Sequence, residues 1–400
     1  MSSGSNPFEG MPLFGDLFKM LGTSGPVQWD GARQLALSIA TDNGAEPNVD
    51  PLERSRFEVL ARVADLQVAQ ATGLSTSTTG RSITVSPVTR SQWALATLDA
   101  FKPVIETMAT ALHPASPGDD AHPAGTALDA NLGADPTDAW LGQIMALLSP
   151  MLLGMTTGSL VGHLATRSFG QFDLPIPRPA GDEILVISAN IDEFGRDWSL
   201  DGDDLRLWVC LHQITHHAVL GIPHVRNRLE SLLQDYAAAF ESDPDGFGSK
   251  LADVDMDPSS ADPMARFQDL LGDPEVMLGV MRSPRQNDLL PLLESLVTVV
   301  VGYVDHIMDR VGSGLIGSYG QVTEALRRRR VEDATSDRFV ERLLGLDLTQ
   351  EHYDRGRAFI DGVVERAGHE SLERLWSDAG NLPTPNEVVA PGLWLARIDL

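Results

Sequence analysis

Two histidines, His212 and His216, lie four residues apart near the middle of the chain. On a helix this spacing puts both side chains on one face, about one turn apart, so both imidazoles can reach one metal ion. The pattern is one residue away from H-E-x-x-H, in which the glutamate deprotonates metal-bound water. Gln213 occupies that position here. An amide can hydrogen-bond a water but has no titratable carboxylate, so the sequence keeps two metal ligands and lacks the base.

The elements that must position these histidines are mainly helical. Apolar residues at helical spacing predict a helix from about Asp203 to Leu220, with Asp201 or a neighbouring Asp as its N-cap and Gly221 at its end. Similar spacing predicts most of the other elements as helices. The segment Ile184–Phe194, rich in branched aliphatic residues, is the best strand signal. The expected fold class is therefore mainly α with a small β element.

Composition along the chain predicts four regions. These are an irregular N-terminal segment (1–27), an N-terminal helical region (28–112), a flexible Pro/Gly/Asp-rich insertion (113–137) and a helical body with a small sheet (138–400). The apolar run Trp140–Ala165 contains Pro150 and polar residues, so we expect two buried helices broken near that proline and no membrane span. The tail contains Pro383, Pro385 and Pro391 and is expected to lie extended over the body.

Charge and cysteine content limit the partners and the compartment. The net charge is −26, from 30 basic and 56 acidic residues, which disfavours binding to nucleic acid or to an anionic membrane. The basic run Arg327–Arg330 is flanked by acidic residues and is predicted to be a solvated, salt-bridged helix end. The one cysteine, Cys210, excludes an internal disulfide, and no secretory signal is visible. We expect a cytoplasmic protein, with Cys210 as a buried apolar residue.

Several segments together resemble one known family. The H-x-x-T-H-H helix, the later run VVGYVDHIMD (300–309), the N-terminal NPFEGMP and VQWDGAR, and FGQFDLPIPR before the strand carry the resemblance. So do LLGLDLTQEHYDRGRAF and LPTPNEVVAPGLWLARI toward the C-terminus. In this order and spacing they resemble the zincin-like metallopeptidase family of high-GC bacteria, which also carries a label from its proximity to coenzyme F420 biosynthesis. The resemblance implies a zincin-like architecture.

The resemblance also implies where the metal site has changed. His212 and His216 match the family's first two zinc ligands, and Gln213 stands at the position of the general base. Val301, just before Gly302-Tyr303, stands where the family has a glutamate that resembles a third ligand. Catalytic zinc normally has three protein ligands, so the loss of both carboxylates predicts that zinc is bound weakly or not at all. Asp305, one helical turn after Val301, is the best-placed substitute ligand.

Three functional hypotheses remain open at this point. The first is a catalytically inactive or impaired pseudo-metallopeptidase that binds a peptide, protein or small molecule in its cleft. The second is an active zinc-dependent metallohydrolase with a non-standard third ligand and base. The third is an all-α interaction protein that shares only the architecture.

Overall fold

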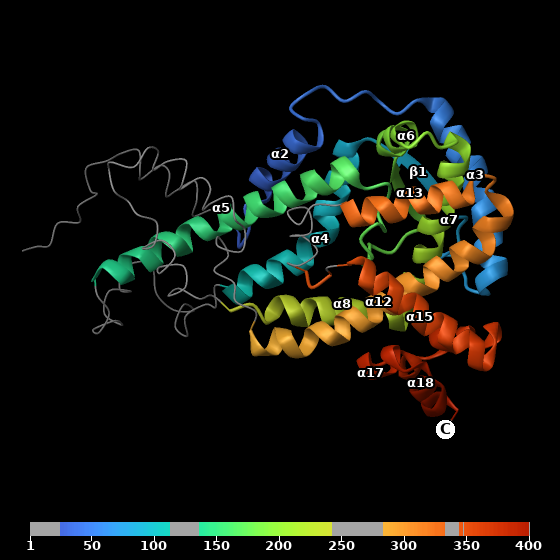
Figure 1. The fold of residues 1–400 in the computed structure, drawn as a ribbon. Helices are drawn as coiled ribbons and strands as arrows, with labels where there is room; N and C mark the ends of the chain where they lie inside the picture. The colour runs from blue at the N-terminus through green and yellow to red at the C-terminus, as the bar shows by residue number, and fades with distance from the viewer. Residues whose placement is uncertain (1–24, 113–135, 242–282, 333–343, 347, 400) are drawn as a thin grey trace, which may run out of the picture.

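The computed structural model describes residues 25–112, 136–241, 283–332, 344–346 and 348–399, without the side chains of 136–149, 331 and 332. Nearly all of the two regions expected to be irregular, 1–27 and 113–137, lie outside this description. Helices dominate the described residues, as predicted (Figure 1). The longer ones are α2 (Trp29–Ala40), α3 (Pro51–Thr72), α4 (Arg90–Leu112), α5 (Pro136–Arg167), α6 (Ser188–Asp197), α7 (Gly202–Leu220), α8 (Pro223–Ala238), α12 (Pro284–Leu315), α13 (Tyr319–Glu332) and α15 (Gln350–Ala367). Short elements complete the C-terminal part: η1 (His369–Leu372), α16 (Glu373–Ser377), η2 (Ala379–Asn381), α17 (Pro385–Val389) and α18 (Pro391–Ile398).

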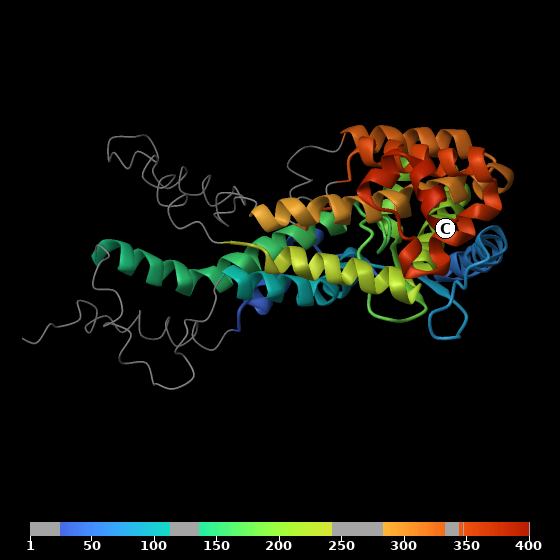
Figure 2. The same cartoon turned by 90° about the horizontal axis from the view of Figure 1, so that it is seen from below.

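The helix that carries the two histidines, α7, lies inside the helical body. Helices α4, α5, α8 and α12 run side by side, with α4 touching α5 and α8, and α8 touching α12 (Figure 2). Helix α7 packs against α3 and against α12. On its other side α12 meets α15, where the backbones of Gly302 and Gly356 touch and leave no room for a side chain at either position. Helix α12 therefore connects α7 to the C-terminal helices.

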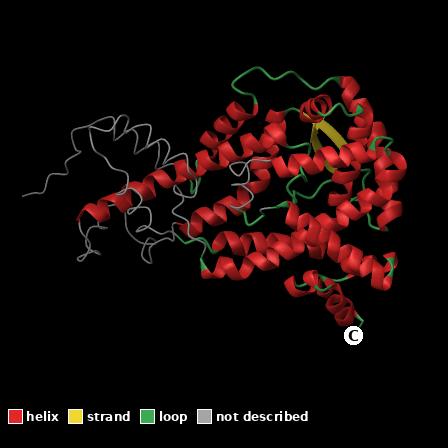
Figure 3. Ribbon diagram, in the orientation of Figure 1, coloured by secondary structure: helices red, strands yellow, loops and turns green. Residues whose placement is uncertain are grey.

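The predicted strand is only half as long as expected. Strand β2 (Glu183–Ile187) pairs in parallel with β1 (Thr84–Val88), with Thr84 opposite Glu183 and Val88 opposite Ile187 (Figure 3). From Ser188 the chain turns into α6, so the second half of Ile184–Phe194 is helical. Ile191 and Phe194, three residues apart, are buried on one face of that helix. The β signal and the helical spacing overlap in this run, and the sequence reading assigned all of it to the strand.

Pro150 does not break the apolar run in two. Helix α5 passes through Pro150 without interruption, contrary to the prediction. Three glycines four residues apart, Gly154, Gly158 and Gly162, let α2 approach it closely, and a Cβ on any of them would collide with α2 or the residue before it. Packing against α2 and α4 offsets the single hydrogen bond that the proline removes.

One described helix, α12, is long and apolar enough to cross a membrane by composition alone. Its most apolar window has a mean hydropathy of 1.4 and is 67% buried inside the protein. That burial is what the central helix of a helical body requires.

The proline-rich tail is not extended. Pro385 and Pro391 begin the short helices α17 and α18, at the first helical position where a missing N–H costs nothing. Thr384 and Glu387 form a capping box at the start of α17. Trp394 of α18 is fully buried against Phe359 of α15, with ring centroids 5.8 Å apart, so the tail packs on the body as predicted but in helical form.

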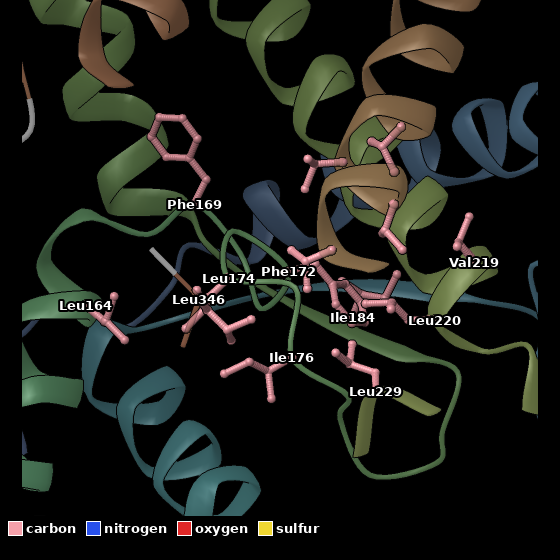
Figure 4. Packing of buried hydrophobic residues seen from close by; sticks show 14 of the residues in the cluster. Leu164, Phe169, Phe172, Leu174, Ile176, Ile184, Val219, Leu220, Leu229 and Leu346 are labelled. Atoms are coloured by element: carbon pink, nitrogen blue, oxygen red, sulfur yellow. The ribbon is translucent and has the colours of Figure 1, made fainter. Parts of the chain in front are cut away.

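The segment between α5 and β2 covers one edge of the small sheet and contributes side chains to the core. Phe169 accepts a hydrogen bond from Ile187 N, and Gln171 N donates to Leu185 O, so this segment covers the edge of β2 opposite β1. Figure 4 shows its buried residues Phe172, Leu174 and Ile176 among the core side chains. The edge of β2 next to α7 is therefore occupied by the chain itself and is closed to an extended peptide.

Candidate functional site: the helix of His212 and His216

Helix α7 holds the two histidines together as predicted. The Asp201 side chain accepts hydrogen bonds from the backbone N–H groups of Asp203 and Asp204 and so caps the helix start. The rings of His212 and His216 lie with centroids 4.4 Å apart. Both side chains are buried, with 7% and 2% of their surface exposed. The two imidazoles are thus adjacent in an environment with little water.

Aromatic contacts and burial keep both imidazoles neutral. The ring of His212 stacks on Trp208 at 4.7 Å, and the ring of His216 is parallel to Phe172 at 6.4 Å. Burial lowers the pKa of His212 well below its ordinary value, and the charges of His216 and Arg330 lower it further. Burial also lowers the pKa of His216, to about 4, with the His212 carbonyl opposing and Arg330 adding to the effect. Neutral imidazole is the form that could ligate a metal.

Hydrogen bonds indicate which nitrogen of each ring carries the proton. His216 Nδ1 lies 3.1 Å from the His212 carbonyl oxygen, so Nδ1 donates and Nε2 keeps its lone pair. The Gln213 amide nitrogen lies 3.4 Å from His212 Nδ1, so this Nδ1 accepts. The neutral ring of His212 then carries its proton on Nε2. Gln213 thereby favours the tautomer of His212 that presents a donor from Nε2.

Gln213 is held at both ends of its amide. Its Oε1 accepts a hydrogen bond from Phe172 N at 2.8 Å, and its Nε2 donates to Asp173 Oδ1 at 2.7 Å. The residue has no exposed surface. The amide at the base position therefore ties α7 to the 169–173 segment, and its hydrogen-bonding groups are directed to the protein.

Asp173 is a site residue that the sequence reading missed. Its Oδ2 accepts from Phe169 N at 2.6 Å while its Oδ1 accepts from Gln213, so both oxygens act as acceptors. Burial raises the pKa of this carboxyl, and the Phe169 N–H and the charge of Arg329 oppose the rise. Gly170 makes the contact with α7, because a Cβ there would lie 2.5 Å from Gln213 Cδ. Asp173 lies 40 residues from Gln213 in the sequence, and its place inside FGQFDLPIPR was the only hint.

The later helix shows where the two remaining predicted residues lie. Val301 is buried in α12, one residue before the Gly302 that packs on α15. Asp305, the suggested substitute ligand, lies 3.5 Å from Arg330 Nη1 through Oδ2. Burial raises the pKa of Asp305, and Arg330 opposes that rise. Among the described residues no three His, Cys, Asp or Glu side chains are grouped so that they could hold a metal ion, so Asp305 does not complete a ligand set with the histidines.

The basic run on α13 separates into two pairs with different surroundings. Arg327 and Arg328 are exposed and pair with Glu324, as the sequence reading predicts. Arg329 and Arg330 instead line a cavity of about 130 Å³ that His212 and Trp208 also line. The reading of the whole run as a solvated helix end is therefore wrong for its second half. Helical spacing carries the signal, because Arg329 and Arg330 follow the buried Leu326 by three and four residues and the buried Val322 by seven and eight.

Two neighbours of the histidines lie outside the site. His217 turns toward Asp182, with its Nε2 3.7 Å from Oδ1, on the side of α7 away from the cavity residues. Cys210 is fully buried, and burial raises the pKa of its thiol far above the ordinary value. It is the buried, inert residue that the sequence predicts.

Comparison with known proteins identifies the family. The model for zincin-like metallopeptidases matches residues 27–395, and the chain belongs to this family, with the mainly α architecture expected of it. A solved structure from Chloroflexus aurantiacus, described as a candidate hydrolase with a novel fold, resembles this chain with a TM-score of 0.61 and 23% identity. The match covers 93% of this chain and 99% of that one, and it shows a shared fold. No curated protein matches the chain.

The donor set can be compared with what zinc requires. Members of this family typically bind zinc, and a catalytic zinc takes three protein ligands and an open position for water. In this chain two imidazoles are adjacent and Gln213 favours a proton on His212 Nε2. Val301, to which the resemblance assigns the third ligand position, is a buried apolar residue. The nearest described carboxyl to Gln213 is engaged with Gln213 and Phe169 N. These residues do not match the ligand set of a catalytic zinc.

Proposed function

We propose that this chain is a pseudo-metallopeptidase, which retains the zincin-like fold but acts by binding a ligand in the cleft beside α7. The observation that carries this proposal is the environment of Gln213. Its amide occupies the base position, with its oxygen bonded to Phe172 N and its nitrogen to the Asp173 carboxylate. A side chain held in this way neither takes a proton from water nor points at a water between the histidines.

The metal-ligand chemistry supports the same proposal. Two neutral imidazoles alone give incomplete coordination, so we expect zinc to be weakly retained or absent in the purified protein. An active metallohydrolase would need a third ligand and a base from other residues. Asp305 is paired with Arg330, and Asp173 accepts two hydrogen bonds from Phe169 and Gln213. Both carboxyls that could take those roles are thus engaged with other groups.

Zinc titration of ligand-restoring variants tests the proposal. The wild type should hold clearly less than one zinc per chain and bind added zinc weakly, whereas Val301→Glu should bind it measurably more tightly. Val301→His provides a neutral ligand at the same buried position, in case a carboxylate there prevents folding. Val300→Glu is the matched control, because Val300 is equally buried in α12 but points about 100° away around the helix.

Two outcomes would count against the proposal. A wild-type chain that retains one zinc through dialysis would mean that a full ligand set exists. Equal zinc binding by Val300→Glu and Val301→Glu would mean that Val301 is not at the third-ligand position.

A further inference from the structure

The cavity beside the degenerate site combines cationic and apolar walls. Arg329 and Arg330 line it from α13, Trp208 and His212 from α7, and Phe169 and Tyr353 from neighbouring segments. The guanidinium of Arg330 lies 3.9 Å from the centroid of the Tyr353 ring, and that of Arg329 lies 4.2 Å from the centroid of Phe169. These cations are therefore fixed at the cavity wall by aromatic stacking.

Hydrogen-bond donors accompany these cations. Trp208 is only 5% exposed, and its buried Nε1–H finds no acceptor among the described residues. His212, stacked on Trp208, carries its proton on Nε2 because its Nδ1 accepts from Gln213. A buried donor without an acceptor costs about 1–3 kcal/mol unless a ligand or water accepts from it. The cavity wall thus carries the positive charge of two guanidinium groups beside the ring of His212.

Acidic acceptors are few among the described residues of the wall, where Arg329 also donates to the Arg167 carbonyl oxygen. Asp173 is the one carboxylate among the described residues that line the cavity, and its oxygens already accept from Gln213 and from Phe169 N. Asp305 is paired with Arg330 and is not among the lining residues. The wall therefore suits a ligand that brings acceptors and negative charge.

We propose that this cavity binds the carboxylate of a small organic acid or of a peptide C-terminus, with an aromatic or branched apolar group beside it. The proposal rests on the function proposed above and names the ligand class of the same cleft. Carboxylate matches a guanidinium in geometry and charge. The apolar walls include Leu164, Leu174 and Leu326, and inorganic phosphate has no apolar group that could pack against them. The volume of about 130 Å³ is close to the ~150 Å³ of an engineered cavity that holds benzene.

Calorimetric titration with benzoate tests this inference. Benzyl alcohol supplies the same ring without the charge, and inorganic phosphate supplies charge without the ring. We expect benzoate to bind at least tenfold more tightly than either. Arg330→Gln should weaken benzoate binding by about 10- to 100-fold, the range for losing one hydrogen bond to a charged group. Arg327→Gln is the matched control on the same helix, exposed and paired with Glu324, and should leave binding unchanged.

A second variant covers the case in which Arg330→Gln fails to fold, since Arg330 also pairs with Asp305. Arg330→Lys keeps the positive charge that pairs with Asp305 and removes only the planar guanidinium fork, and it should weaken benzoate several-fold while leaving benzyl alcohol unchanged. Paired peptides that end in phenylalanine, one with a free C-terminus and one amidated, identify the source of the carboxylate. Preference for the free peptide over benzoate indicates a peptide C-terminus, and the reverse indicates a free acid.

The outcomes separate this inference from the proposed function. Absent benzoate binding, equal binding by benzyl alcohol, or unchanged binding in both Arg330→Gln and Arg330→Lys would overturn the carboxylate site. Stronger binding of phosphate alone would also overturn it. None of these results bears on catalysis, which is measured separately. Chelator-sensitive cleavage of the same peptides would refute the pseudo-metallopeptidase and leave the carboxylate site to be judged by the titrations.

Discussion

Replacing Gln213 by glutamate should destabilise the protein instead of simply restoring a base. In the wild type, Gln213 Nε2 donates to Asp173 Oδ1 at 2.7 Å. Gln213→Glu would place a second carboxylate against the first, and one of the two must then hold a proton. At pH 7, about three units above an ordinary carboxyl pKa, this costs about 4 kcal/mol at about 1.4 kcal/mol per unit. The shared proton's hydrogen bond returns about 1–2 kcal/mol, which leaves a loss of about 2–3 kcal/mol.

This loss of stability depends on pH, and its direction follows from the pKa of the carboxyl pair. The pair's pKa in the folded state is raised above its unfolded value, because one carboxylate repels ionisation of the other. The folded variant therefore binds more protons than the unfolded chain. Its stability relative to the wild type is retained near pH 4 and falls as pH rises toward 7. Urea denaturation of both proteins at pH 4.5 and pH 7 measures the difference.

Exchanging the two groups supplies the control. In Gln213→Glu/Asp173→Asn the new amide donates to the new carboxylate, which still accepts from Phe172 N, and the amide oxygen still accepts from Phe169 N. We expect the double variant to recover to within about 1 kcal/mol of the wild type at pH 7, whereas Asp173→Asn alone leaves two amide donors facing each other and loses about 1–3 kcal/mol. If Gln213→Glu equals the wild type at pH 7 and the exchange adds nothing, the hydrogen bond described for Gln213 is wrong.

Two further perturbations test the surroundings of the histidines. Gly170→Ala should cost about 1–3 kcal/mol by overpacking, because its Cβ would lie 2.5 Å from a Gln213 that cannot move freely. Gly181→Ala, with nothing within 4 Å of the new methyl, is the control in the same segment, and equal urea midpoints for the two would argue against the close contact. The lowered pKa of His216, about 4 in the folded state against an ordinary 6.5, means that stability is complete above pH 6.5 and falls by about 3 kcal/mol as pH drops to 4. His216→Asn keeps a donor toward the His212 carbonyl and should flatten that acid limb, and an unchanged slope would contradict the burial of a neutral imidazole.

Local signals in the sequence predicted the elements that position the site. The helix with His212 and His216 was expected within one residue of its observed start, because the Asp201 cap and the apolar spacing are local features. The overlap of strand and helix signals explains why Ile184–Phe194 was assigned too much strand. The helices that begin at Pro385 and Pro391 were missed, because a proline at the first helical position resembles one in an extended segment.

Contacts between distant segments could not be predicted from local sequence signals. The hydrogen bond from Gln213 to Asp173 spans 40 residues, and nothing in either local sequence indicates the other. The pairing of Asp305 with Arg330 likewise joins α12 to α13, and it engages the residue expected as a substitute ligand from the resemblance and its spacing from Val301. Arg329 and Arg330 were within reach of prediction, since they share a helical face with buried leucine and valine. The flanking acidic residues, however, favour a solvated helix end for the whole run.

Cleavage of a fluorogenic peptide library by the wild-type protein, with and without a chelator, tests the central claim most directly. We predict that no peptide is cut above background, that the chelator changes nothing, and that added zinc produces no activity. Gln213 supplies no base, and Val301, the residue proposed to stand at the third-ligand position, supplies no ligand. A cleavage rate that the chelator abolishes and zinc restores would contradict this prediction, and Asp173 and Asp305 would then be the first residues to substitute.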